Sequence, residues 1–127
     1  MELLNPENVC PPLGLYSHIV KVPAGSELYY ISGQLGVDAD GVAPDSIGEQ
    51  ADLVFSNIVK LLESQGLAAT NIAKLTTYMV AGQDGQEVRK ARIKHLGDHR
   101  PASTAVYVSQ LVDSDWLVEV EAVACRS

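Results

Sequence analysis

The segment from Ser46 to Gly66 constrains the fold most, because it carries the signals for both ends of a helix and an apolar face between them. Ser46 and Glu49 have the spacing of a capping box, in which the two side chains satisfy backbone N–H groups of the first turn. Gly66 suits the position just beyond a helix. The apolar residues recur at the helical period: Ile47, Ala51, Val54, Ile58 and Leu62. Such a helix needs another layer to cover its apolar face.

Strands are predicted on the N-terminal side of this helix. Leu15–Val22 alternates weakly, Glu27–Leu35 is rich in β-formers, and a Pro-Ala-Gly turn separates them, so a hairpin is expected. Gly33 lies inside the second strand. Glycine at such a position indicates a bulge or a close approach of another group to the backbone.

The rest of the chain predicts a strand at Ile72–Val80, a helix at Gln86–Leu96 that Pro101 keeps from continuing, and a closing hairpin of Ser103–Leu111 and Trp116–Cys125. The order is β-β-α-β-α-β-β. It predicts an α+β fold in which one mixed sheet carries both helices on one face. A length of 127 residues suits a single domain, residues 1–127.

Alternation assigns the residues of the last two strands to faces of the sheet. Glu119 and Glu121 share one face of the final strand, and the residues expected to pack on the helices are Val118, Val120, Ala122 and Ala124. In the preceding strand Val106 and Val108 are assigned to the core, and the other face carries Ser103, Ala105, Tyr107 and Ser109. The second face is therefore small, polar and acidic. It fits either plain exposure to solvent or a subunit interface or ligand cleft.

Charge excludes one class of partner. The chain has 9 Lys and Arg against 16 Asp and Glu, a formal net charge of −7. Phosphate binding needs a basic surface, so nucleic acid is not expected as the main partner. Cys10 and Cys125 are expected to be reduced thiols of a cytoplasmic protein, because the first residues lack the pattern of an export signal. No apolar run approaches the roughly twenty residues of a membrane span.

Familiar catalytic motifs are missing. The sequence has no phosphate loop, dinucleotide fingerprint, Cys-x-x-Cys or His-Glu-x-x-His. His18, His95 and His99 lack the spacing of metal ligands, and Ser17 and Ser103 have no evident partners for a hydrolase triad. The residues alone therefore predict a small acidic domain with a possible cleft, but no reaction.

Several segments in register resemble the RidA/YjgF family, the reactive intermediate deaminases. Gly14–Ser17 (GLYS) is similar to that family's Gly-Pro-Tyr-Ser, and Ile31–Asp38 (ISGQLGVD) to its Ser-Gly-Gln-x-x-x-Asp. Glu49–Gly66 resembles its first helix. LTTYMV, LGDHRPA and VEVEAVA follow in the family's order. The similarity covers nearly the whole chain.

This resemblance implies a chorismate-mutase-like fold and a homotrimer whose sheets form a central barrel, with ligand clefts between subunits. It implies hydrolysis of enamines and imines, such as 2-aminoacrylate, to ketoacids and ammonia without a metal or cofactor. Some members carry older labels as endoribonucleases or translation inhibitors. The expected partners are therefore other copies of the same chain and a small-molecule ligand. Neither nucleic acid nor a membrane is expected as a partner.

Carried over residue by residue, the resemblance implies a cleft that includes Tyr16, Gly33, Ser103, Ala105 and Glu119. Tyr16 would line the pocket. The backbone around Gly33 and Ala105 would contact the ligand, with Ser103 nearby. Glu119 would be the catalytic residue that holds or orients the attacking water.

One departure from the family concerns substrate binding. The deaminases have Pro-Ala-Arg where this chain has Pro101-Ala102-Ser103, and that arginine holds the substrate carboxylate in a bidentate pair. Serine donates one neutral hydrogen bond and supplies no charge. Three arginines in and just after the predicted helix Gln86–Leu96 could provide a cation from another direction: Arg89, Arg92 and Arg100.

Three hypotheses follow from these residues. The first is an imine or enamine hydrolase whose specificity Ser103 alters. The second is a non-catalytic small-ligand binder or regulator on the same trimer. The third is an endoribonuclease, which ranks lowest because of the acidic charge.

Overall fold

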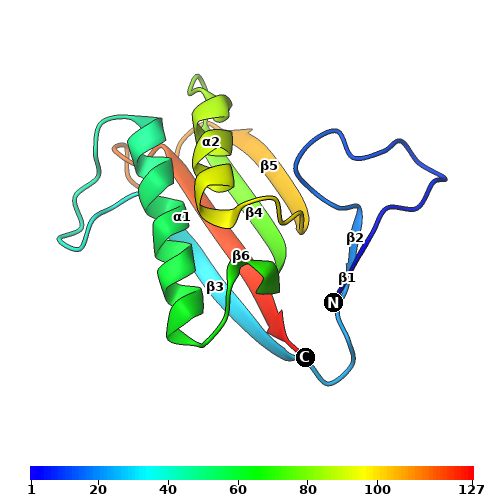
Figure 1. Ribbon diagram of the computed structural model, residues 1–127. Helices are drawn as coiled ribbons and strands as arrows, with labels where there is room; N and C mark the ends of the chain where they lie inside the picture. The colour runs from blue at the N-terminus through cyan, green and yellow to red at the C-terminus, as the bar shows by residue number, and fades with distance from the viewer.

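A four-stranded mixed sheet with two helices on one face forms most of the computed structural model, which describes residues 1–127 (Figure 1). Across the sheet the strands are β3 (Glu27–Leu35), β6 (Val118–Arg126), β4 (Ile72–Val80) and β5 (Ala102–Val108). β4 and β5 run parallel, and the other neighbours run antiparallel. The remaining elements are α1 (Ile47–Ser64), η1 (Ala69–Asn71), α2 (Gly85–Leu96), β1 (Glu2–Leu4) and β2 (Ile19–Lys21).

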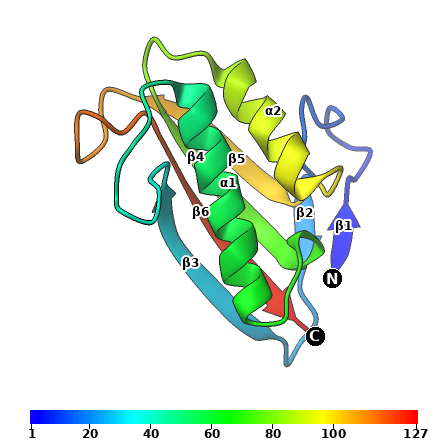
Figure 2. The same ribbon diagram turned by 60° about the vertical axis from the view of Figure 1, so that its left-hand side comes forward.

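Both helices cover the same face of the sheet, as predicted. In Figure 2, α1 lies over the part of the sheet that holds β3 and β6, and α2 lies beside it toward β5. We call the covered side the helix face and the other side the open face. The helix face and the buried side of α1 form one hydrophobic core, which includes Phe55, Ile58, Leu75, Val118 and Val120.

α1 is capped by Ser46 and ends before Gly66 as predicted, but only half of the predicted capping box forms, because the Glu49 carboxylate accepts from the Ser46 hydroxyl and not from a backbone N–H. The Glu49 N–H donates to the Ser46 side chain at 3.2 Å, and the Ser46 hydroxyl donates to the Glu49 carboxylate at 3.0 Å. Gly66 has a φ of 70°, a left-handed conformation that glycine adopts without steric cost. The predicted apolar face of the helix is buried throughout.

The predicted first hairpin is wrong. Only Ile19–Lys21 of the segment Leu15–Val22 is a strand, and it pairs with β1 instead of β3. The residues before it are held elsewhere, because Ser17 donates through its N–H to the Pro101 carbonyl and through its hydroxyl to the Arg100 carbonyl. The partner of β3 is β6.

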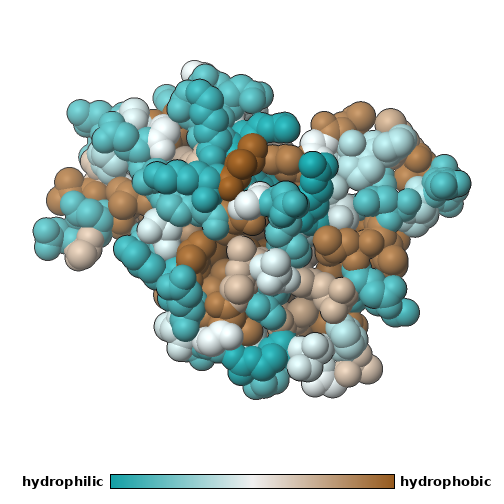
Figure 3. Space-filling model, in the orientation of Figure 1, coloured by the Kyte–Doolittle hydropathy of each residue, from teal (hydrophilic) through white to brown (hydrophobic).

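The N-terminal segment therefore lies beside the β5 end of the sheet (Figure 1). Apolar residues gather on this segment, on the right of Figure 3. They include Leu3, Val9, Leu13 and Ile19, all exposed.

The predicted closing hairpin is also wrong. β5 ends at Val108 and pairs in parallel with β4, while β6 lies between β3 and β4. The chain passes from β4 through α2 to β5, which is the usual way to join two parallel strands. The loop after β5 then returns the chain to the centre of the sheet.

This pairing reverses the predicted faces of β5. Ser103, Ala105 and Tyr107 stand opposite Leu75, Thr77 and Met79, which are buried on the helix face. Val106 was assigned to the core, but it stands opposite Tyr78 on the open face and is 41% exposed. The faces of β6 are as predicted: Glu119 and Glu121 lie on the open face, opposite Tyr78 and Thr76.

An ion-pair cluster joins the outer sides of the two helices. The Asp52 carboxylate on α1 accepts hydrogen bonds from Lys94 and His95 on α2, each at 2.8 Å. The hydrogen bond from Lys94, followed by that from His95, lowers the pKa of Asp52. A lowered carboxyl pKa contributes stability above the unfolded-state pKa, and that contribution is lost as the pH falls.

We expect Asp52→Asn to lower the free energy of unfolding at pH 7 by no more than about 1 kcal/mol, because Asp52 is 43% exposed and water screens the cluster. The difference from wild type should shrink as the pH falls below about 4, where the unfolded carboxyl group takes up its proton first, and should be lost once the pH is below the lowered pKa of folded Asp52. Urea unfolding at pH 7 and pH 3 measures both values. Glu63→Gln removes the same charge from the same helix without breaking an ion pair. Equal losses of unfolding free energy in Asp52→Asn and Glu63→Gln would show that the ion-pair cluster does not stabilise the fold.

Candidate functional site

Gly33 and Glu119 meet on the open face. The pairing of β3 with β6 shifts register between Ile31 and Gln34, so the predicted bulge at Gly33 is confirmed. The Glu119 side chain occupies the space beside it: a Cβ added at Gly33 would lie 2.8 Å from the Glu119 carboxyl carbon. The predicted close approach to the Gly33 backbone is therefore made by Glu119.

The second glutamate of this face has a different environment. Glu121 accepts a hydrogen bond from the Tyr78 hydroxyl at 2.8 Å, and this bond raises the pKa of Tyr78. No hydrogen bond within the chain ties the Glu119 carboxylate, which is half-buried. The two carboxylates also line a shallow hollow of about 490 Å³ with Val108 and the loop after β5. Of the two, Glu119 is the more buried carboxylate and the one without a hydrogen-bond partner in the chain.

Tyr16 lies in the loop before β2. Its hydroxyl accepts a hydrogen bond from the Leu13 N–H at 3.1 Å, and its ring meets His18 edge-on with the centroids 5.7 Å apart. The same loop is fixed to the start of β5 through Ser17, and the Arg92 guanidinium of α2 donates to the Leu15 carbonyl. The loop therefore joins β5 and α2 at one corner of the helix face.

A cavity of about 280 Å³ lies between α2 and β5 at this corner. We call it the α2–β5 pocket, and its lining includes Leu15, Thr77, Arg89, Arg92, Ala105 and Tyr107. Ser103 lies two residues before Ala105 on the same side of β5. Its hydroxyl has one distant acceptor, the Pro101 carbonyl at 3.4 Å.

The predicted site residues thus form two separate groups. Gly33 and Glu119 lie together on the open face, whereas Ser103 and Ala105 lie on the helix face, next to the loop that carries Tyr16. Within one chain these two groups are on opposite sides of the sheet. The sequence prediction placed Ser103, Ala105 and Glu119 on one face because it reversed β5.

The α2–β5 pocket itself was not predicted. The signal in the sequence is the spacing of Arg89 and Arg92, which are three apart and therefore point to neighbouring positions on one side of a helix. Sequence reasoning named both as possible cations. It did not place them in a cavity with Ala105.

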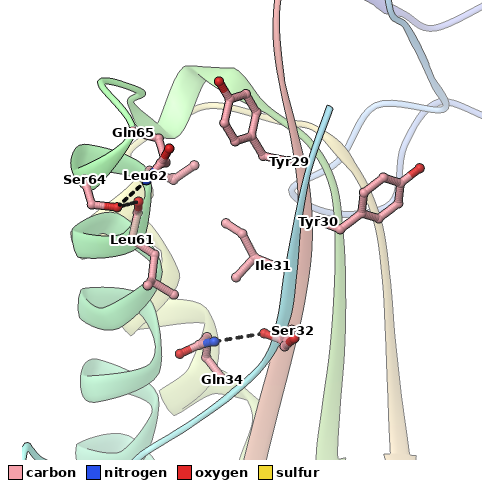
Figure 4. Close-up of a pocket in the computed structure, with 9 residues that line it drawn as sticks. All are labelled: Tyr29, Tyr30, Ile31, Ser32, Gln34, Leu61, Leu62, Ser64 and Gln65. Atoms are coloured by element: carbon pink, nitrogen blue, oxygen red, sulfur yellow. Dashed lines mark hydrogen bonds between the residues drawn. The ribbon is translucent and has the colours of Figure 1, made fainter. Parts of the chain in front are cut away.

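A third hollow lies between β3 and the C-terminal half of α1 and has a volume of about 380 Å³. Figure 4 shows Ile31 and Leu61 pointing into it from the strand and the helix, while Tyr30 points to the other side of β3. Its lining has no carboxylate, imidazole or cationic group. It offers no acid–base chemistry apart from tyrosine hydroxyls.

Other chemical features are few. No group of three or more His, Cys, Asp or Glu side chains is arranged to hold a metal ion. Cys10 and Cys125 are both free thiols, the first exposed and the second buried. Neither helix is long and apolar enough to cross a bilayer. The expectation that no cofactor is used stays a prediction.

Comparisons with known proteins give a consistent result. The family model described as Endoribonuclease L-PSP matches residues 7–126. A RutC family protein of Pyrococcus horikoshii is 33% identical over 127 residues, covering 98% of each chain. A 2-iminobutanoate/2-iminopropanoate deaminase of Bos taurus is 33% identical over 116 residues, covering 90% of this chain and 82% of that protein.

Solved structures show the same fold. A Rid-family protein from Yersinia pestis has a TM-score of 0.85 at 25% identity, with 98% of each chain covered. The structure of TdcF from E. coli with bound serine has a TM-score of 0.73 at 25% identity, with 100% of each chain covered.

The contact between Gly33 and Glu119 predicts an energetic coupling. We expect Gly33→Ala to destabilise the protein by up to about 1–3 kcal/mol, because the added methyl group overlaps the glutamate side chain. Glu119→Ala should remove most of that cost, so the double variant should be more stable than the sum of the single effects predicts. Denaturant unfolding of the four proteins measures the coupling.

Gly14→Ala is the control for this cycle, because an added Cβ there would be 3.7 Å from its nearest neighbour, an ordinary contact. Strict additivity of Gly33→Ala and Glu119→Ala would show that the two residues do not interact.

Proposed function

The chain belongs to the RidA/YjgF family, and on that premise we propose that it hydrolyses small imines or enamines in a cleft between the subunits of a homotrimer. The proposal draws on the relative named as an iminobutanoate and iminopropanoate deaminase. The observation that carries it is the Glu119 carboxylate, held against the Gly33 backbone and free of hydrogen bonds within the chain.

A carboxylate in this state can act as a general base. In the proposed reaction Glu119 takes a proton from a water molecule while the water oxygen bonds to the imine carbon, and it returns that proton to the nitrogen to give a carbinolamine. Glu119 then moves the proton of the carbinolamine hydroxyl to the nitrogen, the C–N bond breaks as the C=O bond forms, and the nitrogen leaves as ammonia. The product is a ketone. An enamine substrate first takes up a proton at carbon to become the imine. Water supplies the oxygen, and no oxidant or reductant is consumed.

The separation of the two residue groups supports a cleft made by two subunits. Glu119 and Gly33 face away from the helices, whereas Ala105 and the Tyr16 loop are on the helix side near β5. β5 is an edge strand whose residues 104–107 are exposed. Packing the β5 edge of one subunit near the open face of another would bring both groups to one ligand, as closed ring assembly allows.

A non-catalytic ligand binder is the second candidate. The observation that favours it is Ser103, which supplies no charge at the position of the family's carboxylate-binding arginine. An endoribonuclease, the activity in the description of the matching family model, ranks third because the chain carries a net charge of −7.

The test is the release of ammonia and ketoacid from 2-iminobutanoate generated enzymatically in the assay, measured above the spontaneous rate. We expect wild type to accelerate hydrolysis and Glu119→Gln to lower kcat/KM by about 10²–10⁴-fold, the usual contribution of a general base. Glu121→Gln is the matched control, because it removes the neighbouring carboxylate of the same strand face.

Unchanged activity in Glu119→Gln would remove this residue from the mechanism. Ligand binding by a wild-type protein that does not accelerate hydrolysis would favour the non-catalytic candidate.

A further inference from the structure

Three of the four arginines of this acidic chain have no carboxylate partner. The ion pairs of the structure use Lys21, Lys90, Lys94, His95 and Arg126. Arg89, Arg92 and Arg100 take part in none of them, although the chain has 16 Asp and Glu. In a protein with excess acidic residues, a group of cations left unpaired indicates a site for an external anion.

Arg92 is the central member of this group. It is half-buried, and burial lowers its pKa, with further contributions from the charges of Arg89 and Arg100. One of its N–H groups donates to the Leu15 carbonyl, which orients the guanidinium. Arginine has five N–H donors in a planar fork, so donors remain for a ligand. A bound anion would offset both the desolvation and the repulsion between the three cations.

The surroundings of Arg92 fit a small ligand. Arg89 and Arg92 line the α2–β5 pocket from the helix, and Ala105 and Tyr107 line it from the strand. Tyr107 extends over the start of α2, since a Cβ added at Gly85 would be 2.7 Å from the Tyr107 hydroxyl oxygen. No carboxylate lines this pocket. A volume of about 280 Å³ suits a molecule of a few carbon atoms.

We propose that the α2–β5 pocket binds the carboxylate of a small organic acid through Arg92 and Arg89. The cation that Ser103 does not supply from β5 is thereby supplied from α2. The inference rests on the proposed function only for the reaction, which would then use imines that carry a carboxylate. Binding of the acid itself depends on the pocket alone.

The test is calorimetric titration with 2-oxobutanoate, compared with 2-butanone, which has a similar carbon skeleton without the carboxylate. We expect 2-oxobutanoate to bind at least about tenfold more tightly than 2-butanone. Arg92→Gln should weaken 2-oxobutanoate binding by about thirtyfold or more, as loss of one partner of a hydrogen-bonded charge pair does. Arg92→Lys should fall between the two, because it keeps the charge without the planar fork.

Arg89→Gln is the second variant, because Arg92 also holds the Leu15 loop and its loss can disturb folding. Arg89 is exposed and makes no hydrogen bond within the chain, so Arg89→Gln should fold normally and weaken 2-oxobutanoate binding several-fold. Lys90→Gln is the matched control: it removes the same charge from the same helix, outside the pocket, and should leave binding unchanged.

Equal binding of 2-oxobutanoate and 2-butanone would overturn the inference. So would equal losses in Arg89→Gln and Lys90→Gln, since these would reflect only the overall charge. The proposed function can be contradicted independently of this inference. If the arginines bind the carboxylate but imines are not hydrolysed, the binding site is supported and the proposed reaction is contradicted. If imines are hydrolysed equally well without either arginine, the proposed reaction is supported and the binding site is contradicted.

Discussion

The central position of β6 is the constraint on which the rest of the structure depends. This strand pairs with β3 on one side and β4 on the other, so its two sets of side chains decide what each face of the sheet can be. Val118, Val120 and Ala122 are buried under the helices. Their neighbours Glu119 and Glu121 must then point to the open face. The same alternation that builds the core therefore places a carboxylate beside Gly33.

The reaction proposed for this protein would use both sides of this sheet. The open face holds a carboxylate suited to moving a proton, and the corner between α2 and β5 holds cations suited to binding an acid. A single subunit keeps them apart. If the β5 edge of one subunit met the open face of the next, every cleft would contain the carboxylate of one subunit and the cations of the other. The oligomer would then be part of the catalytic machinery as well as a source of stability.

Local signals predicted the elements but not all of their neighbours. The cap at Ser46 and the bulge at the glycine in β3 depend on local backbone geometry, so the residue types at these positions were enough to predict them. β6 could be oriented because one set of its side chains is apolar and the other acidic. β5 could not, because Ala105 and Tyr107 on one side are as compatible with a core as Val106 and Val108 on the other. The parallel pairing with β4 decides its faces, and that pairing is non-local.

A complementation experiment tests the central claim most directly. Glu119→Gln and Arg92→Gln subunits, each expected to have strongly reduced activity alone, are unfolded, mixed in equal amounts and refolded together. If each cleft combines Glu119 of one subunit with Arg92 of another, random assembly gives about a quarter of the clefts both intact groups, and imine hydrolysis should return to a corresponding fraction of wild type. Mixed assemblies no more active than the average of the two parent variants would contradict a cleft shared between subunits.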